Sequence, residues 1–199
     1  MINHNKKQTG FTLLMTLIVV SVVVSVGLTI LDLSIKQLKL STGSKDSEIA
    51  FHAANAGLEC AQYNREINAA TIEGGGDTSF SCFGSNILST AANINFSDNS
   101  VAGNGVYRYE HSFTWGETGS ERCTEITTVA LSTNGITDDS ITVDVGDMMA
   151  AVPGYPISAG DKVCDPGAQC TIVSVRGYSR SCSEKNIHGA IQREVLLEF

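Results

Sequence analysis

The feature that constrains this chain most is an uncharged apolar segment near its start, residues 11–31. Valine, leucine and isoleucine make up most of it, and no lysine, arginine, aspartate or glutamate interrupts it. As an α-helix the segment reaches about 31 Å, which matches the hydrocarbon thickness of a bilayer. The sequence therefore predicts one membrane-spanning helix, and the roughly 165 residues that follow are enough for a single compact domain.

Charged residues on either side of this segment predict its orientation. Lys6 and Lys7 precede it, whereas the acidic residues begin at Asp32. Because basic residues stay in the cytoplasm, we expect a single pass through the cytoplasmic membrane, with the bulk of the chain outside the cytoplasm. The segment is longer than the apolar region of a secretory signal peptide and lacks an Ala-x-Ala ending, so we expect it to be retained.

The net charge of the chain is −8, and the sequence contains no basic cluster. An acidic surface repels the phosphate backbone of nucleic acids. Nucleic acid is therefore not an expected partner.

All the cysteines follow the apolar segment, and their number is even; they are Cys60, Cys82, Cys123, Cys164, Cys170 and Cys182. In a domain carried across a membrane this favours disulfides, although many pairings remain open. The absence of any Cys-x-x-Cys pair argues against a zinc site. We favour the short-range pair Cys164–Cys170, because the intervening Asp, Pro and Gly can turn the chain back. Two further pairing hypotheses are Cys60–Cys82, from helix end to loop, and Cys123–Cys182, between two strand ends.

A second helical pattern continues the first, because residues 34–64 contain no proline. Apolar positions recur at helical spacing and form one stripe, made of Ile49, Ala53, Ala56, Cys60 and Tyr63. A separate polar stripe is made of Glu48, Asn55, Glu59, Gln62 and Glu66. The pattern predicts one continuous helix whose second half packs against a domain.

Strand patterns follow the helix. Residues 107–115 alternate aromatic or histidine side chains with polar ones, which is the period of a sheet with unlike faces. Further strand candidates lie at 123–131, 141–145, 171–175 and 193–199, whereas residues 85–105 show little periodicity and are expected to form a loop. The sequence thus predicts an α+β fold, with an antiparallel sheet packed on one long helix.

The junction Lys6-Lys7-Gln8-Thr9-Gly10-Phe11-Thr12-Leu13-Leu14 resembles the cleavage site of type IV prepilins and pseudopilins. The resemblance implies that a membrane peptidase cuts between Gly10 and Phe11 and that the amine of Phe11 is methylated. It also implies that the helix beginning with Thr12, Leu13, Leu14 and Met15 is an assembly element. Glycine would leave the scissile backbone unobstructed.

Two later segments add to this resemblance. Residues 50–59 resemble a stretch of PilX-type minor pilins, and residues 174–178 with 193–199 resemble the final hairpin of many minor pilins. The implied organisation is a basic leader peptide (1–10), a membrane-spanning assembly helix (11–33), an amphipathic continuation (34–66) and a disulfide-stabilised β-rich head (67–199). The many small residues of the second helical part would also let a sheet approach closely.

The pilin family implies both a function and its partners. The expected function is structural: the helix enters a filament core, and the head is presented for priming or adhesion. Expected partners are other pilin subunits, the prepilin peptidase, the inner-membrane assembly platform, and membrane lipid before assembly. The chain would begin as a single-pass protein of the cytoplasmic membrane and end in an extracellular filament.

One residue departs from the pattern of major pilins. Those proteins place a glutamate at the fifth mature position, where it neutralises the amine of a neighbouring subunit, but this chain has Met15. A carboxylate in lipid is costly without a partner. The departure favours a minor, tip-proximal subunit, with a pseudopilin of a type II secretion system as the alternative.

A third interpretation, from another functional class, is a membrane-anchored binding or hydrolytic domain that never polymerises. The sequence contains no hydrolase elbow, zinc-protease helix or phosphate-binding glycine loop, so neither enzymatic activity nor a cofactor is expected. Weak calcium candidates are Asp138, Asp139, Asp144 and Asp147, whose spacing does not fit an EF-hand. His111 lies on an aromatic strand face and is expected to be packed rather than catalytic.

Overall fold

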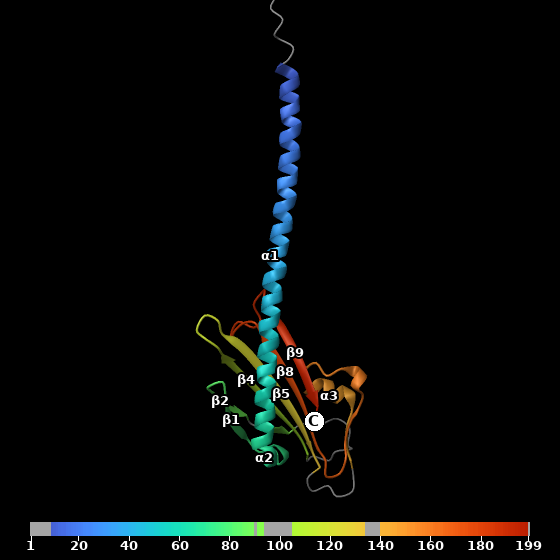
Figure 1. Cartoon of the computed structure of the whole chain (residues 1–199). Coiled ribbons are helices and arrows are strands. Elements are labelled where there is room, and N and C mark those ends of the chain that lie inside the picture. Colours follow the sequence, from blue (N-terminus) through green and yellow to red (C-terminus); the bar gives the residue numbers. More distant parts are fainter. Residues whose placement is uncertain (1–8, 90, 94–104, 134–139, 199) are drawn as a thin grey trace, which may run out of the picture. The chain divides into compact units, whose positions relative to one another are not determined.

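The computed structural model describes residues 9–89, 91–93, 105–133 and 140–198. It divides into two compact units, residues 1–45 and residues 46–199, and each is described by itself. Helix α1 (Thr9–Ile67) contributes its first part to the first unit and its last part to the second (Figure 1). The predicted continuous helix is thus confirmed.

The part of α1 in the first unit is apolar and exposed around its whole circumference from Phe11 onward through the predicted span. Over its most apolar window the mean hydropathy is 2.7 and none of the surface is buried, so this helix is long and apolar enough to cross a membrane. Its hydroxyl groups bond to the preceding turn: Thr16 Oγ1 donates to the Leu13 carbonyl at 2.9 Å, and Ser21 Oγ to that of Ile18 at 2.8 Å. Such bonds satisfy polar groups without water.

The second unit is built on a five-stranded antiparallel sheet. The strand order is β3-β4-β5-β8-β9, in which β3 is Ala92–Asn93, β4 Val106–Trp115, β5 Arg122–Ser132, β8 Gln169–Tyr178 and β9 Gln192–Glu198. Four of these strands, β4, β5, β8 and β9, coincide with predicted strands. Each of these four strands pairs with its neighbour over most of its length, so the sheet offers a continuous surface on which residues 46–67 of the helix pack (Figure 1).

Residues 46–67 of α1 pack closely on one face of this sheet. Their buried face is made almost wholly of small residues, namely Ala50, Ala53, Ala54, Gly57, Cys60 and Ala61. A Cβ atom placed on Gly57 would lie 2.3 Å from Thr124 Cγ2, and one placed on Gly177 of β8 would lie 2.2 Å from the Ala50 carbonyl oxygen. The fold is therefore α+β and pilin-like, and the small residues allow the close approach that the sequence suggested.

The buried stripe of the helix differs from the predicted one. Ala53 and Cys60 are buried as expected, but Tyr63 is 52% exposed, and Asn64 and Arg65 are buried in its place. The physical reason is that the smallest side chains allow the closest contact, so the face centred on Ala50 and Gly57 turns toward the sheet. Arg65 then falls on the buried side, where it finds polar partners.

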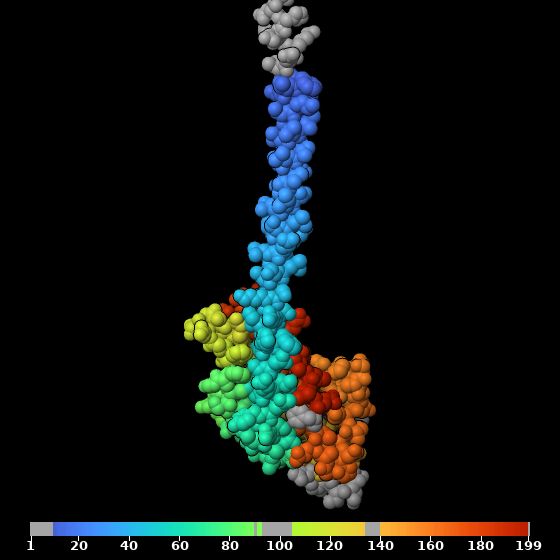
Figure 2. Space-filling model, viewed as in Figure 1, coloured from blue at the N-terminus to red at the C-terminus, as the bar shows by residue number. Residues whose placement is uncertain are grey.

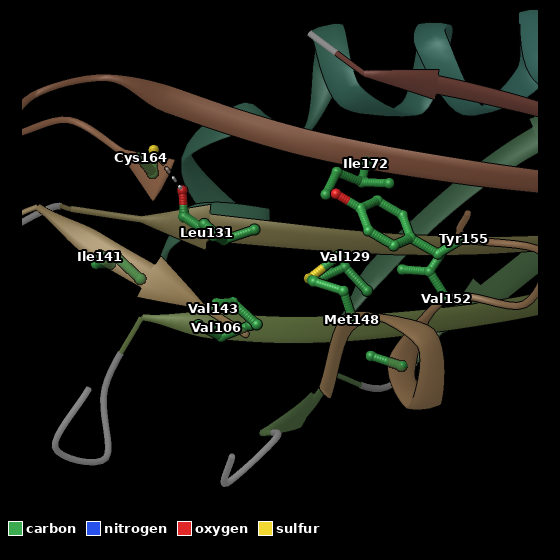
Figure 3. Packing of buried hydrophobic residues seen from close by; sticks show 11 residues of the cluster. Val106, Val129, Leu131, Ile141, Val143, Met148, Val152, Tyr155, Cys164 and Ile172 are labelled. Atoms are coloured by element: carbon green, nitrogen blue, oxygen red, sulfur yellow. Dashed lines mark hydrogen bonds between the residues drawn. The ribbon is translucent and has the colours of Figure 1, made fainter. Parts of the chain in front are cut away.

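A layer of short elements covers part of the opposite face of the sheet. It consists of β6 (Ile141–Val143), β7 (Lys162–Cys164), α3 (Val145–Ala151) and a 3₁₀ turn (Ile157–Ala159). Figure 3 shows Met148 and Tyr155 of this layer pointing toward Val129 and Ile172 of the sheet. The head thus has apolar cores on both faces of the sheet, and a third, smaller cluster is made of Ile72, Tyr109 and Ala130.

A second hairpin was missed by the sequence prediction. Strands β1 (Thr78–Cys82) and β2 (Ser85–Ser89) pair with each other, and a short helix α2 (Ala69–Glu73) precedes them. The expected loop at 85–105 is therefore wrong for residues 85–89, where Ile87 and Ser89 turn inward while Asn86 and Leu88 face out, and for residues 92–93, which form β3. Residues 94–104 lie outside the described part of the chain.

Three disulfides join the head: Cys60–Cys82, Cys123–Cys182 and Cys164–Cys170. These are the same pairs that were put forward from the sequence. The first ties α1 to β1, the second ties β5 to the segment between β8 and β9, and the third closes the turn between β7 and β8. Each removes conformational freedom from the unfolded chain and stabilises the head by about 2 to 4 kcal/mol.

Candidate assembly helix and head surface

The predicted processing junction lies in the first turns of α1. Gly10 and Phe11 are both helical and exposed, and nothing lies within 4 Å of the position that a Cβ of Gly10 would occupy. The side chains of Thr12, Leu13, Leu14 and Met15 are exposed as well. Residues 1–8, which include Lys6 and Lys7, lie outside the described part of the chain.

The apolar span ends at a charged pair. Lys36 Nζ lies 2.8 Å from Asp32 Oδ2, one helical turn away, and both side chains are exposed. Before this pair, the described helix carries no charge from Gly10 to Leu31. The boundary at Asp32 is therefore the place where the helix changes from a surface that requires apolar surroundings to one that tolerates water.

The far end of α1 is fastened to the head by a buried ion pair that sequence reasoning missed. Arg65 Nη2 lies 2.7 Å from Glu73 Oε1 on α2, and Arg65 Nε donates to Thr171 Oγ1 of β8 at 2.9 Å. The Tyr109 hydroxyl donates to the carbonyl of Ile72 at 3.0 Å, and burial raises the pKa of Tyr109 to about 12. These contacts fix the helix end rather than offer a reactive group.

The face of the sheet opposite the helix carries a charge network around Glu125. This carboxylate accepts hydrogen bonds from Lys185 and from the Tyr178 hydroxyl, the latter at 2.8 Å, and Arg176 Nη2 lies 3.2 Å away. Burial alone would raise the pKa of Glu125, but the bonds from Lys185 and Tyr178 and the charges of Arg176 and Lys185 hold it below its usual value. The network is paired and stabilising.

His111 is packed, as predicted. Its ring lies against Phe80 at a centroid distance of 5.2 Å in an edge-to-face arrangement, and neither ring nitrogen has a hydrogen-bond partner among the described residues. Burial lowers the pKa of His111 to about 4. The imidazole is therefore neutral at physiological pH, and it is an unsatisfied polar group inside the head.

The calcium candidates are only partly described. Asp138 and Asp139 lie outside the described residues. Asp144 caps α3 by accepting a hydrogen bond from the Gly146 amide at 2.7 Å, and Asp147 lies in the first turn of the same helix. Among the described residues, no three His, Cys, Asp or Glu side chains gather as a metal site would require.

Comparison with known proteins identifies no relative: no family model, no curated protein and no solved structure matches this chain.

Proposed function

We propose that this chain is a structural minor subunit of a type IV pilus, located near the filament tip. In this role the leader is removed after Gly10, the apolar helix moves from lipid into the filament core, and the head is presented for priming or adhesion. The partners would be other pilin subunits, the prepilin peptidase, the inner-membrane assembly platform and, before assembly, membrane lipid.

One observation carries the proposal: residues 11–31 form an uncharged helix whose side chains are exposed on every side. Large apolar side chains exposed on all sides of a helix require an apolar environment. Lipid provides one before assembly, and neighbouring copies of such a helix provide another afterwards. The internally bonded hydroxyls of Thr16 and Ser21 suit both environments, because they need no water.

The minor, tip-proximal role is supported by Met15. A subunit within the repeating shaft would need a carboxylate at this position to pair with the amine of the next Phe11. Met15 provides an apolar, flexible side chain instead, which packs in lipid or between helices but neutralises no charge. A subunit at the tip has no subunit ahead of it and does not require that pairing.

Mass spectrometry of the native protein tests the proposal directly. We expect a chain that begins at Phe11 with a methylated amine, and a Gly10→Val variant that keeps its leader because the branched side chain obstructs the scissile bond. Gly27→Val is the matched control, since Gly27 is equally unobstructed in the same helix and its replacement should be processed normally. A native chain that retains Met1, or one that lacks the apolar helix, would contradict the proposal.

Copy number then tests the minor role. In sheared filaments the protein should be present in far fewer copies than the main subunit, and its removal should reduce filament number. Recovery of the protein only with a secretion complex would assign it to a pseudopilus instead. Equal abundance with the main subunit would contradict the tip-proximal placement.

A further inference from the structure

The β1–β2 hairpin has an unusual turn. Its two central residues are Phe83 and Gly84, with φ of 49° and 75°, and both values are positive. Two-residue hairpin turns require such angles and usually place Asn, Asp or Gly at the first position. Phe83 is the only non-glycine residue with a positive φ in the described part of the chain. A bulky aromatic side chain in this conformation is strained, and such strain is typical of functional positions.

Phe83 forms an exposed stack with Trp115, the last residue of β4. The ring centroids are 5.0 Å apart with an interplanar angle of 20°, and Phe83 remains 51% exposed. One face of the Phe83 ring thus covers Trp115, while much of the ring is open to solvent. We refer to this pair as the aromatic platform.

The platform is held rigidly from beneath. Trp115 Nε1 donates to Thr124 Oγ1 at 2.9 Å, and Thr124 Oγ1 donates to the carbonyl of Ala53 in α1 at 3.0 Å. Next to Phe83, the Cys60–Cys82 disulfide ties the hairpin to the same helix. Both rings are therefore fixed before any ligand arrives, which lowers the entropic cost of binding.

The hairpin that carries the platform is neutral and polar. Residues 78–89 contain no charged side chain, although the chain as a whole has 13 basic and 21 acidic residues. The outward-facing side chains Ser79, Ser81 and Asn86 offer two hydroxyls and one amide, and the outward-facing Leu88, opposite Ser79, is 81% exposed. Ser81 pairs with Asn86 within three residues of Phe83, so these groups lie within about 10 Å of the turn along the strands. In the space-filling view the hairpin, in green, lies at the surface beside the helix (Figure 2).

We propose that the aromatic platform and the outward face of the β1–β2 hairpin bind a neutral glycan of β-linked pyranose rings. A pyranose ring in this linkage presents a flat face of C–H groups, which stacks on an aromatic ring, and equatorial hydroxyls that bond to Ser and Asn side chains. Two rings are too small an area for a stable protein interface, which buries about 800 Å² on each partner. Residues 78–89 offer no carboxylate to a cationic ligand, whereas Glu117 and Glu121 lie in the turn after Trp115, so the salt dependence of binding separates a neutral ligand from a charged one.

The site can be tested without filaments, so its failure would be distinct from failure of the pilus proposal. Trp115 is the only tryptophan of the chain, and its emission therefore reports this site alone. The full chain, dissolved in dodecylphosphocholine rather than a sugar-based detergent, is titrated with cellopentaose and chitopentaose. We expect a saturable change in Trp115 emission for at least one of them, with Kd of about 1 mM or below. Maltopentaose, whose α-linkages curve the chain, should bind more weakly.

The decisive variant separates binding from stability. Phe83→Asn removes the ring but places a residue suited to positive φ in the turn, so binding should weaken at least about tenfold while Tm stays equal or rises. Phe83→Tyr should keep the affinity. Phe51→Asn is the matched control, because Phe51 is also about half exposed (48%) but lies on α1, more than two helical turns before the Cys60 that is bonded to the hairpin, and this change should leave binding intact.

Four results would overturn the glycan site. They are no emission change with either β-linked sugar, undiminished affinity in Phe83→Asn, loss of affinity in Phe51→Asn equal to that in Phe83→Asn, and affinity that falls steeply between 50 and 500 mM salt. The last would assign the site to a charged ligand, since binding of a neutral sugar does not depend on ionic strength.

Discussion

The two parts of helix α1 differ in the size and the burial of their side chains, although they form one continuous element. From Phe11 to Leu31 the side chains are large, mostly branched and exposed on every side. Along residues 50–61 the inward residues are alanine, glycine and cysteine, and the helix backbone meets the backbone of the sheet at Gly177. The first part presents apolar surface that its own chain does not cover, whereas the second part has already buried its face.

This difference shows that the hydrophobicity of a helix does not reveal how it packs. The side chains of the more apolar part are exposed, whereas the less apolar part contributes Ala54, Cys60 and Ala61 to the core of the head. Small residues stabilise by allowing close approach and many dispersion contacts, rather than by the area of each side chain. Substitutions in the two parts should therefore have different consequences for the head.

The largest expected effect comes from adding one methyl group at the closest contact. Gly177→Ala would place a Cβ 2.2 Å from the Ala50 carbonyl oxygen and 2.3 Å from the Ala54 amide nitrogen, so the helix backbone must move. We expect the free energy of unfolding of the head to fall by about 3 kcal/mol. Chemical denaturation followed by Trp115 emission measures this, because Trp115 lies in the head.

The matched control for this change lies in the other unit. Gly43 is also a helical glycine, but nothing lies within 4 Å of its added Cβ. Gly43→Ala should leave the unfolding of the head unchanged and raise helix stability by up to about 1 kcal/mol. If the two alanine variants had equal effects on Trp115 emission, the distinction between the two parts of the helix would be wrong.

Acid should have the next largest effect, and only on the head. Burial lowers the pKa of His111 to about 4, so the folded head resists protonation whereas the unfolded chain accepts a proton below its ordinary pKa of about 6.5. The stability contributed by neutral His111 is complete above about pH 6.5 and is lost as pH falls toward 4. Between pH 7.5 and 5 the free energy of unfolding should fall by about 2 kcal/mol.

Two variants isolate this contribution. His111→Phe keeps an aromatic ring against Phe80 but cannot be protonated, so most of the slope between pH 7.5 and 5 should disappear. His188→Gln changes an exposed histidine and should keep the slope of the native protein. The carboxylate of Glu125 interferes little, because its pKa is lowered in the folded head, so its contribution to stability is lost mainly below the ordinary pKa of about 4.5 that it has in the unfolded chain. An unchanged slope in His111→Phe would refute the assignment.

The smallest effect is expected in the exposed apolar part. Leu17→Ala should change the unfolding free energy of the head by less than about 0.5 kcal/mol, because Leu17 is 67% exposed. Leu131→Ala, its matched control in the buried core, should cost about 3 kcal/mol. A loss near that of Leu131→Ala would show that the exposed part does stabilise the head.

Regular patterns in the sequence predicted most strands of the five-stranded sheet. The short polar strands were not predicted. Strand β4 was evident because aromatic and polar residues alternate over its whole length. Strands β1 and β2 were missed because each has two serines among five residues and β2 also has an asparagine, and those residues also favour loops. The signal that could have found them was Phe80 and Ile87 on either side of the Phe83-Gly84 turn, with serine at alternate positions.

Long-range polar contacts could not be predicted from local patterns. Arg65 follows Tyr63 closely, and an apolar stripe favoured burial of the tyrosine. The structure buries the arginine because Glu73 and Thr171, the second of them more than a hundred residues away, satisfy its guanidinium. The stack of Phe83 on Trp115 was missed for the same reason, since β4 and the hairpin turn meet only in the folded head.

The contact between helix and sheet also governs the order of events during synthesis. A ribosome makes Ala53 first and then Thr124, whose hydroxyl donates to the Ala53 carbonyl 71 residues earlier. Gly177 of β8, whose backbone packs against Ala50, is made only later. Until β8 has emerged, the small-residue face of the helix lacks the strand against which it packs, and such incomplete surfaces favour misassembly. Translation that stops before β8 therefore yields the long helix without a finished head.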